Sequence, residues 1–286
     1  MSKYLSLLFI GFLILTACSN EKETPNGMKY TVIEKGDGEM PKANQVIVFD
    51  FVMKDNKDSV WASTYEAGIP GASLIGDSTH VAREDGMTQM FRQLSVGDSV
   101  KTVIPLKKFF SDIVRSPMPP AMDTTATITY TIKVKDISSL EDFYKNRELW
   151  VFQRDQESIA KYLSEKSLTA EKDTSGLEYI IHTNAGGPKP TIASCVEVLY
   201  TGRFLRNGQI FDQGETAFPL EGVIPGWRIA IPLLGKGDSA TFFIPSKLAY
   251  GPEGIPRQMP PDAILIFDVK LIDIKGEFDP VTRQCK

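Results

Sequence analysis

Cysteine and histidine are scarce in this sequence. Its 286 residues include three cysteines and two histidines, and the histidines, His80 and His182, fall in opposite halves of the chain. A catalytic metal site needs several such ligands close together, and the sequence does not cluster them. A Ser/His/Asp or Cys/His constellation is lacking for the same reason. We therefore predict no metal site and no cofactor.

An excess of positive charge is also lacking. Lysine and arginine number 32 against 36 aspartates and glutamates, which gives a formal net charge of −4. Proteins that bind nucleic acid usually carry clustered basic residues. We therefore expect no nucleic-acid partner. The length leaves room for two domains of ordinary size.

Long apolar runs are absent as well. One short run, residues 4–15, follows Lys3. A bilayer-spanning helix needs about 20 apolar residues, so this run fits a signal peptide over residues 1–17. An uncleaved signal anchor is the alternative.

The signal ends in Leu15-Thr-Ala-Cys18, which resembles a bacterial lipobox. The resemblance implies that Cys18 carries lipid and that residues 18–26 form a polar tether without a fold. The protein would then be a lipoprotein of the bacterial cell envelope. Its lipid anchor would hold it to the membrane, facing the periplasm or the surface.

Glycine and proline are both missing from residues 138–175. Ser138 and Glu141 fit a capping box, and the apolar residues that follow recur at roughly helical spacing. We predict a helical connector here, as one long helix or two consecutive ones. A disordered charged linker is the alternative.

Residues 196–274 alternate between apolar and other side chains in two places. The pattern predicts strands with one buried face near Val196–Tyr200 and near Leu265–Leu271. Asn207-Gly208 is a hairpin turn signal that leads into a strand ending at Asp212. Strands around one helix define an α+β fold. The helix is predicted from one apolar face: Trp227, Ala230, Ile231 and Leu234.

Short fragments in a fixed order strengthen this reading. They are Val198-Leu-Tyr-Thr-Gly202, Gly208-Gln-Ile-Phe-Asp212, Val223-Ile-Pro-Gly-Trp227, Leu248-Ala-Tyr-Gly251, Met259-Pro-Pro261 and Ile266-Phe-Asp-Val269. Together they resemble the FKBP-type peptidyl-prolyl cis-trans isomerases. The resemblance covers residues 176–276 and leaves 277–286 as a C-terminal tail.

The resemblance implies an apolar cleft that receives a proline. Trp227 would be its floor, Tyr200, Phe211 and Phe267 its walls, and Asp212 would lie at its rim. The Ile224 backbone N–H would bind the substrate chain, and the Tyr250 hydroxyl would hold a substrate carbonyl. A turn residue that caps local N–H groups is the alternative reading of Asp212. Three more apolar residues would contact substrate: Val223, Ile255 and Met259.

Residues 27–137 repeat part of this pattern, which predicts a second domain of the same fold. Gly97-Asp-Ser99 echoes Gly237-Asp-Ser239, and Met118-Pro-Pro120 echoes Met259-Pro-Pro261. The site residues are largely replaced, so we expect this domain to be degenerate. The replacements are Asp50 for Tyr200, Ala62 for Asp212, Met87 for Trp227 and Phe110 for Tyr250, with Trp61 and Tyr130 as the remaining aromatic walls.

The expected function is isomerisation of X–Pro bonds in exported or envelope proteins while they fold. The partners would be proline-containing polypeptides that are unfolded or partly folded; the oligomeric state is left open. The alternative is an envelope chaperone or binding module with little isomerase activity. In an FKBP-like sheet, the strand near Cys195 runs beside the last strand, so the resemblance also allows a disulfide from Cys195 to Cys285.

Overall fold

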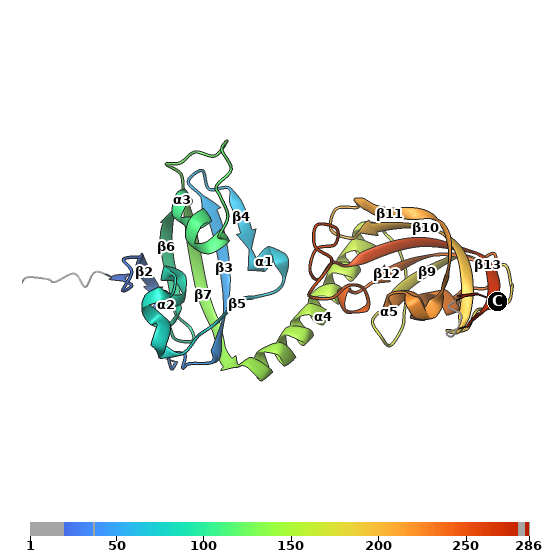
Figure 1. Ribbon diagram of the computed structural model, residues 1–286, viewed down its shortest axis with the longest axis horizontal. Coiled ribbons are helices and arrows are strands. Elements are labelled where there is room, and N and C mark those ends of the chain that lie inside the picture. Colours follow the sequence, from blue (N-terminus) through green and yellow to red (C-terminus); the bar gives the residue numbers. More distant parts are fainter. Residues whose placement is uncertain (1–19, 37, 280–283, 286) are drawn as a thin grey trace, which may run out of the picture. The chain divides into compact units, whose positions relative to one another are not determined.

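The computed structural model describes residues 20–36, 38–279 and 284–285 (Figure 1). The predicted signal peptide and Cys18 lie outside the described residues. The chain divides into two compact units between Phe143 and Tyr144. Among the described residues, no helix is long and apolar enough to cross a membrane.

The first unit is built on an antiparallel sheet with the strand order β1-β2-β6-β7-β3-β4, and β5 pairs with β3. Its strands are β1 (Glu21–Glu23), β2 (Lys29–Glu34), β3 (Gln45–Asp55), β4 (Val60–Ser63), β5 (Gly71–Leu74), β6 (Ser99–Pro105) and β7 (Thr127–Ser139). Its short helices are α1 (Thr64–Ala67), η1 (Ser78–Arg83), α2 (Gly86–Phe91), α3 (Leu106–Lys108) and η2 (Phe109–Val114). Met90, Phe91 and Leu94 pack from α2 and the residues after it onto the sheet.

The second unit has the corresponding strand order, β8-β9-β12-β13-β10-β11, and β14 pairs with β13. Its strands are β8 (Glu171–Lys172), β9 (Glu178–Thr183), β10 (Ser194–Phe204), β11 (Ile210–Pro219), β12 (Ser239–Ile244), β13 (Leu265–Asp279) and β14 (Gln284–Cys285). Its helices are η3 (Leu220–Gly222), α5 (Pro225–Ala230), η4 (Ile231–Leu233) and η5 (Ser246–Leu248), together with most of α4 (Leu140–Glu165). The four residues predicted to share a helix face, Trp227 to Leu234, are all buried in one core.

The repeated Gly-Asp-Ser segments make the same contacts in both units. Asp98 and Asp238 each accept a backbone N–H three residues earlier, from Ser95 at 2.7 Å and from Gly235 at 2.8 Å. The preceding glycines, Gly97 and Gly237, have φ angles of 88° and 95°, which only glycine adopts without strain. The sequence echo therefore corresponds to one turn built twice.

The amino-terminal tether prediction is wrong from Glu21 onward. Residues 21–23 form β1, which pairs with β2, and Thr24 is buried. The Asn26 N–H donates to the Gln89 side chain at 3.0 Å. This segment belongs to the first sheet because its backbone groups form hydrogen bonds there and the Thr24 side chain is buried there.

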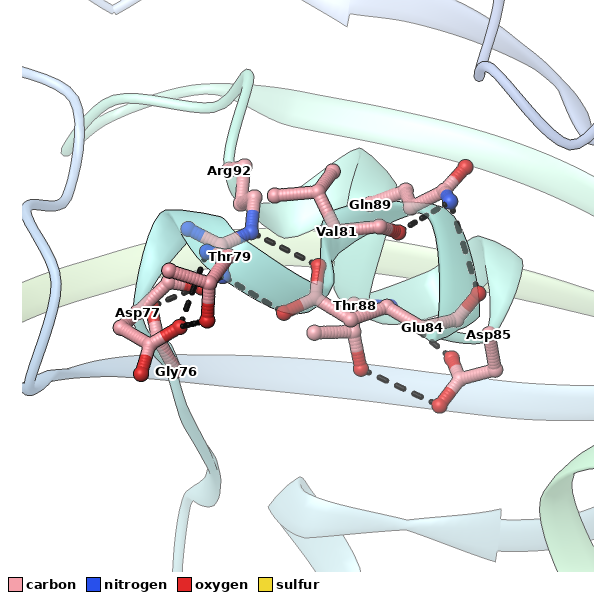
Figure 2. Close-up of polar contacts among 9 residues, drawn as sticks. All are labelled: Gly76, Asp77, Thr79, Val81, Glu84, Asp85, Thr88, Gln89 and Arg92. Atoms are coloured by element: carbon pink, nitrogen blue, oxygen red, sulfur yellow. Dashed lines mark hydrogen bonds and ion pairs between the residues drawn. The ribbon is translucent and has the colours of Figure 1, made fainter.

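The segment between Trp61 and Gly86 contains α1, β5 and η1. Arg92 contacts the second half of this segment: its guanidinium pairs with Glu84 at 2.5 Å and donates to the Gly76 carbonyl at 2.8 Å (Figure 2). The Gln89 amide donates to the Val81 carbonyl at 2.8 Å. These contacts fix the segment against α2.

The predicted connector holds one helix, and its cap differs from the prediction by one residue. Ser139, not Ser138, caps α4: the Asp142 N–H donates to its Oγ at 3.1 Å, and its hydroxyl donates to the Asp142 carboxylate. Ser138 instead continues strand β7, paired with Val46. The helix ends at Glu165, and residues 171–172 form β8 instead of a further helix.

Helix α4 also covers the second sheet. Ile159 and Leu163 pack against Phe243, Ile264 and Ile266. The strand predicted over Leu265–Leu271 is present and alternates as predicted from Phe267 to Leu271, but the prediction is wrong at Ile266. Phe267 faces the core formed with α5, and Ile266 is buried on the opposite face. Sequence alternation could not reveal this second layer, because Asp268 and Lys270 keep the strand looking amphipathic.

Candidate active site

The predicted aromatic residues meet where β10, β11 and β13 face helix α5. Trp227 is 6% exposed, and its ring lies nearly perpendicular to two others. The centroid distances are 5.3 Å to Tyr200 and 5.1 Å to Phe267, with interplanar angles of 85° and 84°. Phe211 in turn meets Phe267 edge-on at 5.6 Å. Edge-to-face contacts of this kind are favourable between aromatic rings.

Gly202 makes room for this arrangement. It lies in β10 opposite both Asp212 of β11 and Phe267 of β13. A Cβ atom built on Gly202 would lie 2.6 Å from the Phe267 ring and 2.8 Å from the Phe211 ring. A side chain at this position would therefore have to displace the rings.

Asp212 and two tyrosines form the polar rim of the site. The Tyr200 hydroxyl donates a hydrogen bond to Asp212 Oδ2 at 2.7 Å. Burial, this hydrogen bond and the Asp212 charge raise the pKa of Tyr200 to about 12. Burial and the Asp212 charge also raise the pKa of Tyr250. Both hydroxyls therefore stay protonated at neutral pH.

The alternative reading of Asp212 as a turn cap does not match the geometry. Asn207 performs that role, since its Oδ1 accepts the Gln209 N–H at 3.1 Å. Asp212 is exposed at the start of β11, after the turn, rather than at the end of a strand as the sequence predicted. Its side chain points to Tyr200.

A cavity of about 500 Å³ opens beside these groups. Ile255 and Met259 close one wall: they form an isolated β-bridge, in which the Met259 N–H donates to the Ile255 carbonyl at 2.8 Å. The lining residues are Phe204, Gln209, Ile210, Phe211, Asp212, Tyr250, Ile255, Gln258 and Met259. Apolar side chains share this lining with polar groups, and polar atoms contribute more of its exposed surface than apolar atoms do.

Val223 and Ile224 are half-buried against the same core, just before α5. The Ile224 carbonyl accepts the Trp227 N–H at 3.0 Å. The Ile224 N–H makes no backbone hydrogen bond to any described residue. The Trp227 Nε1–H is likewise buried without a partner in the described part of the chain.

Two aromatic residues of the site were missed by the sequence reasoning. Phe204 lies 4.9 Å from Phe211, and Phe218 lies 5.2 Å from Trp227. Phe204 falls on the same strand face as Tyr200, four residues earlier, so extending the alternation would have found it. Phe218 is placed by the register of β11 against β10, opposite Val196, which no local pattern reveals.

The first unit fills the corresponding space. Tyr130 corresponds to Phe267, and Met53 pairs with Tyr130 as Gly202 pairs with Phe267. Met53 therefore corresponds to Gly202, and Phe51, two residues earlier, corresponds to Tyr200. The predicted match of Asp50 with Tyr200 is wrong by one residue. Such a shift moves a side chain to the opposite face of a sheet. Asp50 indeed pairs with Lys135 at 3.3 Å, whereas Phe51 lies 5.8 Å from the Tyr130 ring.

Met53 and Phe109 occupy this space in the first unit. Met53 is buried where Gly202 leaves room, and the buried Phe109 ring lies 6.4 Å from both Trp61 and Tyr130. Ala62 lies opposite Met53 as Asp212 lies opposite Gly202, which agrees with the predicted replacement. Met87 and Phe110 are half-buried against this core. Buried side chains therefore occupy the position that Gly202 holds in the second unit.

No group of three or more histidine, cysteine or carboxylate side chains within the described residues is placed to hold a metal ion. Cys195 is disulfide-bonded. Cys195 lies opposite Gly276 of β13. Two residues further along β13, Phe278 pairs with Cys285 of β14.

Comparison with known proteins agrees with this geometry. Residues 186–272 match the family model of the FKBP-type peptidyl-prolyl cis-trans isomerases. The chain is 45% identical over 105 residues to a probable FKBP-type peptidyl-prolyl cis-trans isomerase FkpA of Neisseria meningitidis, a match that covers 35% of this chain and 38% of that protein. It is 32% identical over 178 residues to the outer membrane protein MIP of Legionella longbeachae, covering 57% of this chain and 75% of that protein. A crystal structure of a peptidyl-prolyl cis-trans isomerase from Pseudomonas syringae shows 31% identity, covers 43% of this chain and 92% of that one, and has a TM-score of 0.40.

The chain belongs to the FKBP-type peptidyl-prolyl cis-trans isomerase family. It spans 38% and 39% of the length of two FkpA relatives that it matches.

Proposed function

We propose that this chain is a peptidyl-prolyl cis-trans isomerase and that its activity lies in residues 176–276. The observation that supports this most directly is the aromatic cluster around Trp227 beside the open cavity. Gly202 lets the Phe211 and Phe267 rings meet, since a Cβ atom there would lie within 3 Å of both. The family match over residues 186–272 covers the same site.

The reaction asks little covalent chemistry of the protein. Rotation about an X–Pro bond crosses a barrier of about 18–20 kcal/mol that amide resonance sets. An apolar cavity removes water from the amide and binds the twisted form better than the planar one. Each ~1.4 kcal/mol of such preference accelerates rotation about tenfold.

Each site residue then has a distinct role. The substrate proline lies on Trp227, between walls formed by Tyr200, Phe211 and Phe267. The free Ile224 N–H donates to the substrate backbone, and the Tyr250 hydroxyl donates to a substrate carbonyl. Asp212 orients the Tyr200 hydroxyl, with which it shares a 2.7 Å hydrogen bond. Val223, Ile255 and Met259 contact the residues that flank the proline.

The test is a proline-isomerisation assay on the chain from Asn20 to Lys286. Interconversion of an X–Pro peptide should be accelerated in proportion to enzyme concentration. Refolding of a protein limited by proline isomerisation should be accelerated too, since uncatalysed isomerisation takes about 10–100 s. Rates equal to those without enzyme would rule out the activity.

We propose that the first unit is a degenerate FKBP-like domain, connected to the second through α4, and that it binds polypeptide without isomerising it. The shared strand order supports the fold, and the plugging side chains Met53 and Phe109 support the loss of activity. A binding role is favoured by three exposed apolar residues at one edge of its sheet: Val60, Trp61 and Tyr65, exposed by 45%, 38% and 64%. Val60→Ser, Trp61→Ser and Tyr65→Ser together should weaken suppression of client aggregation and leave peptide isomerisation unchanged.

We propose that the protein is held in the bacterial cell envelope by lipid on Cys18, where its substrates are exported proteins that are still folding. The lipobox-like Leu-Thr-Ala-Cys18 supports the anchor, and one relative is named an outer membrane protein. Expressed in a bacterial host, the Cys18→Ala variant should lose labelling by a fatty-acid probe. An unlabelled wild type that is nevertheless cleaved and released would show that Cys18 ends an ordinary signal peptide.

A further inference from the structure

A carboxylate of α4 is buried against the segment that follows β12. Asp155 is fully buried, and its Oδ2 accepts two hydrogen bonds from Ser246: from the backbone N–H at 2.7 Å and from the hydroxyl at 2.6 Å. Its Oδ1 forms an ion pair with Arg154 at 2.7 Å. The Ser246 hydrogen bonds and the Arg154 ion pair offset part of the cost of burying this charge. Burial nevertheless raises the pKa of Asp155, and its Oδ1 has no described partner in hydrogen-bond geometry.

Ser246 connects Asp155 to the residues on either side of Tyr250 through backbone hydrogen bonds. The Ser246 carbonyl accepts the Ala249 N–H at 3.0 Å and the Gly251 N–H at 2.9 Å. These two residues flank Tyr250, whose side chain lines the cavity. The position of the tyrosine hydroxyl therefore depends on Ser246, which Asp155 holds.

The far end of the same segment is fixed to α4 as well. The Arg147 guanidinium pairs with the Asp262 carboxylate, and Arg154 donates to the Asp262 carbonyl at 2.9 Å. The Asp262 N–H in turn donates to the Gly251 carbonyl at 2.9 Å. Asp262 has φ 51°, a left-handed conformation that a non-glycine residue keeps only where surrounding contacts hold it.

We propose that Arg147, Arg154 and Asp155 are positioning residues of the isomerase site. They fix both ends of residues 246–262, the segment that carries Tyr250, Ile255 and Met259. The family model matches residues 186–272, so Arg147, Arg154 and Asp155 lie outside the matched region. This inference rests on the proposed function: α4 acts on the reaction through the Tyr250 segment without touching substrate.

The kinetic test compares Asp155→Asn with wild type in the full chain from Asn20 onward. Asparagine keeps the shape but loses the charge, so hydrogen bonds to Ser246 should weaken and kcat/KM should fall about tenfold. Glu148→Gln is the matched control: Glu148 also joins α4 to this segment, through Lys247 at 3.2 Å, but both side chains are exposed. The control should keep wild-type kcat/KM.

A double-mutant cycle separates positioning from general stability. If Asp155 acts through Tyr250, Asp155→Asn should have little further effect on kcat/KM once Tyr250→Phe is present. Equal proportional losses in both backgrounds, or no loss in either, would overturn the inference.

Amide hydrogen exchange provides a test that does not depend on isomerase activity. In Asp155→Asn, the Gly251 and Asp262 amides should exchange about tenfold faster than in wild type, because opening this segment becomes easier. Protection equal to that of wild type would refute the positioning role. If the wild type lacked isomerase activity but Asp155→Asn still showed the faster exchange, the proposed function would be refuted. The contact between α4 and the segment would remain established.

Discussion

Gly202 and Met53 occupy the same register position in the two sheets. Gly202 pairs with Phe267 and Asp212, and Met53 pairs with Tyr130 and Ala62. The missing side chain at 202 lets the Phe211 and Phe267 rings meet, whereas the Met53 side chain is buried in the first core. The two sheets therefore differ in side-chain volume at this one position.

Gly202→Ala should reduce isomerase activity strongly while the domain stays folded. The added Cβ would lie within 3 Å of both rings, and overpacking of this kind usually costs about 1–3 kcal/mol of stability. Kinetics of X–Pro isomerisation and chemical unfolding would measure the two effects. Gly214→Ala in β11 is the matched control, since no atom lies within 4 Å of its Cβ position; wild-type activity in both variants would contradict our account of Gly202.

Trp227→Ala and Asp212→Val should separate packing from function. Truncating the buried tryptophan should abolish activity and lower the free energy of unfolding by about 3–5 kcal/mol. Asp212→Val should lower activity with little change in unfolding, because Asp212 is exposed and its partner is the Tyr200 hydroxyl. Full activity of the valine variant would remove Asp212 from the site.

The Tyr200 hydroxyl should titrate far above an ordinary tyrosine. Its pKa is raised to about 12, so its hydrogen bond to Asp212 stabilises the fold below pH about 10 and is lost as the pH rises through about 12. The ultraviolet absorbance of wild type minus that of Tyr200→Phe should show phenolate appearing with a midpoint near 12. A midpoint near 10 would show that Asp212 and burial do not act on this group.

Cys195 should be bonded to Cys285. The structure shows Cys195 as disulfide-bonded, and the register of β10 and β14 along β13 places the backbones of these two residues near Gly276 and Phe278. The denatured, unreduced chain from Asn20 onward should contain no reactive thiol, and Cys195→Ser should expose one. Two thiols in the wild type would refute the bond.

The sequence was most informative where local rules apply. The α5 face, the Asn207-Gly208 hairpin and the aromatic set around Trp227 follow from periodicity, turn chemistry and the family motifs. The sequence failed where distant segments decide the outcome. Asp155 looks like one more charge on a solvated helix, and only the fold shows it buried against Ser246. The match of Asp50 with Tyr200 failed because the sequence does not indicate register between strands.

We expect the Trp227 site, and not its counterpart in the first unit, to isomerise X–Pro bonds. The most direct measurement is kcat/KM for an X–Pro peptide in a protease-free assay, made on the chain from Asn20 onward with leucine at each of the two equivalent positions. Trp227→Leu should lower kcat/KM by more than about tenfold, and Met87→Leu should leave it unchanged. Equal activity in both variants, or a larger loss in Met87→Leu, would contradict the assignment.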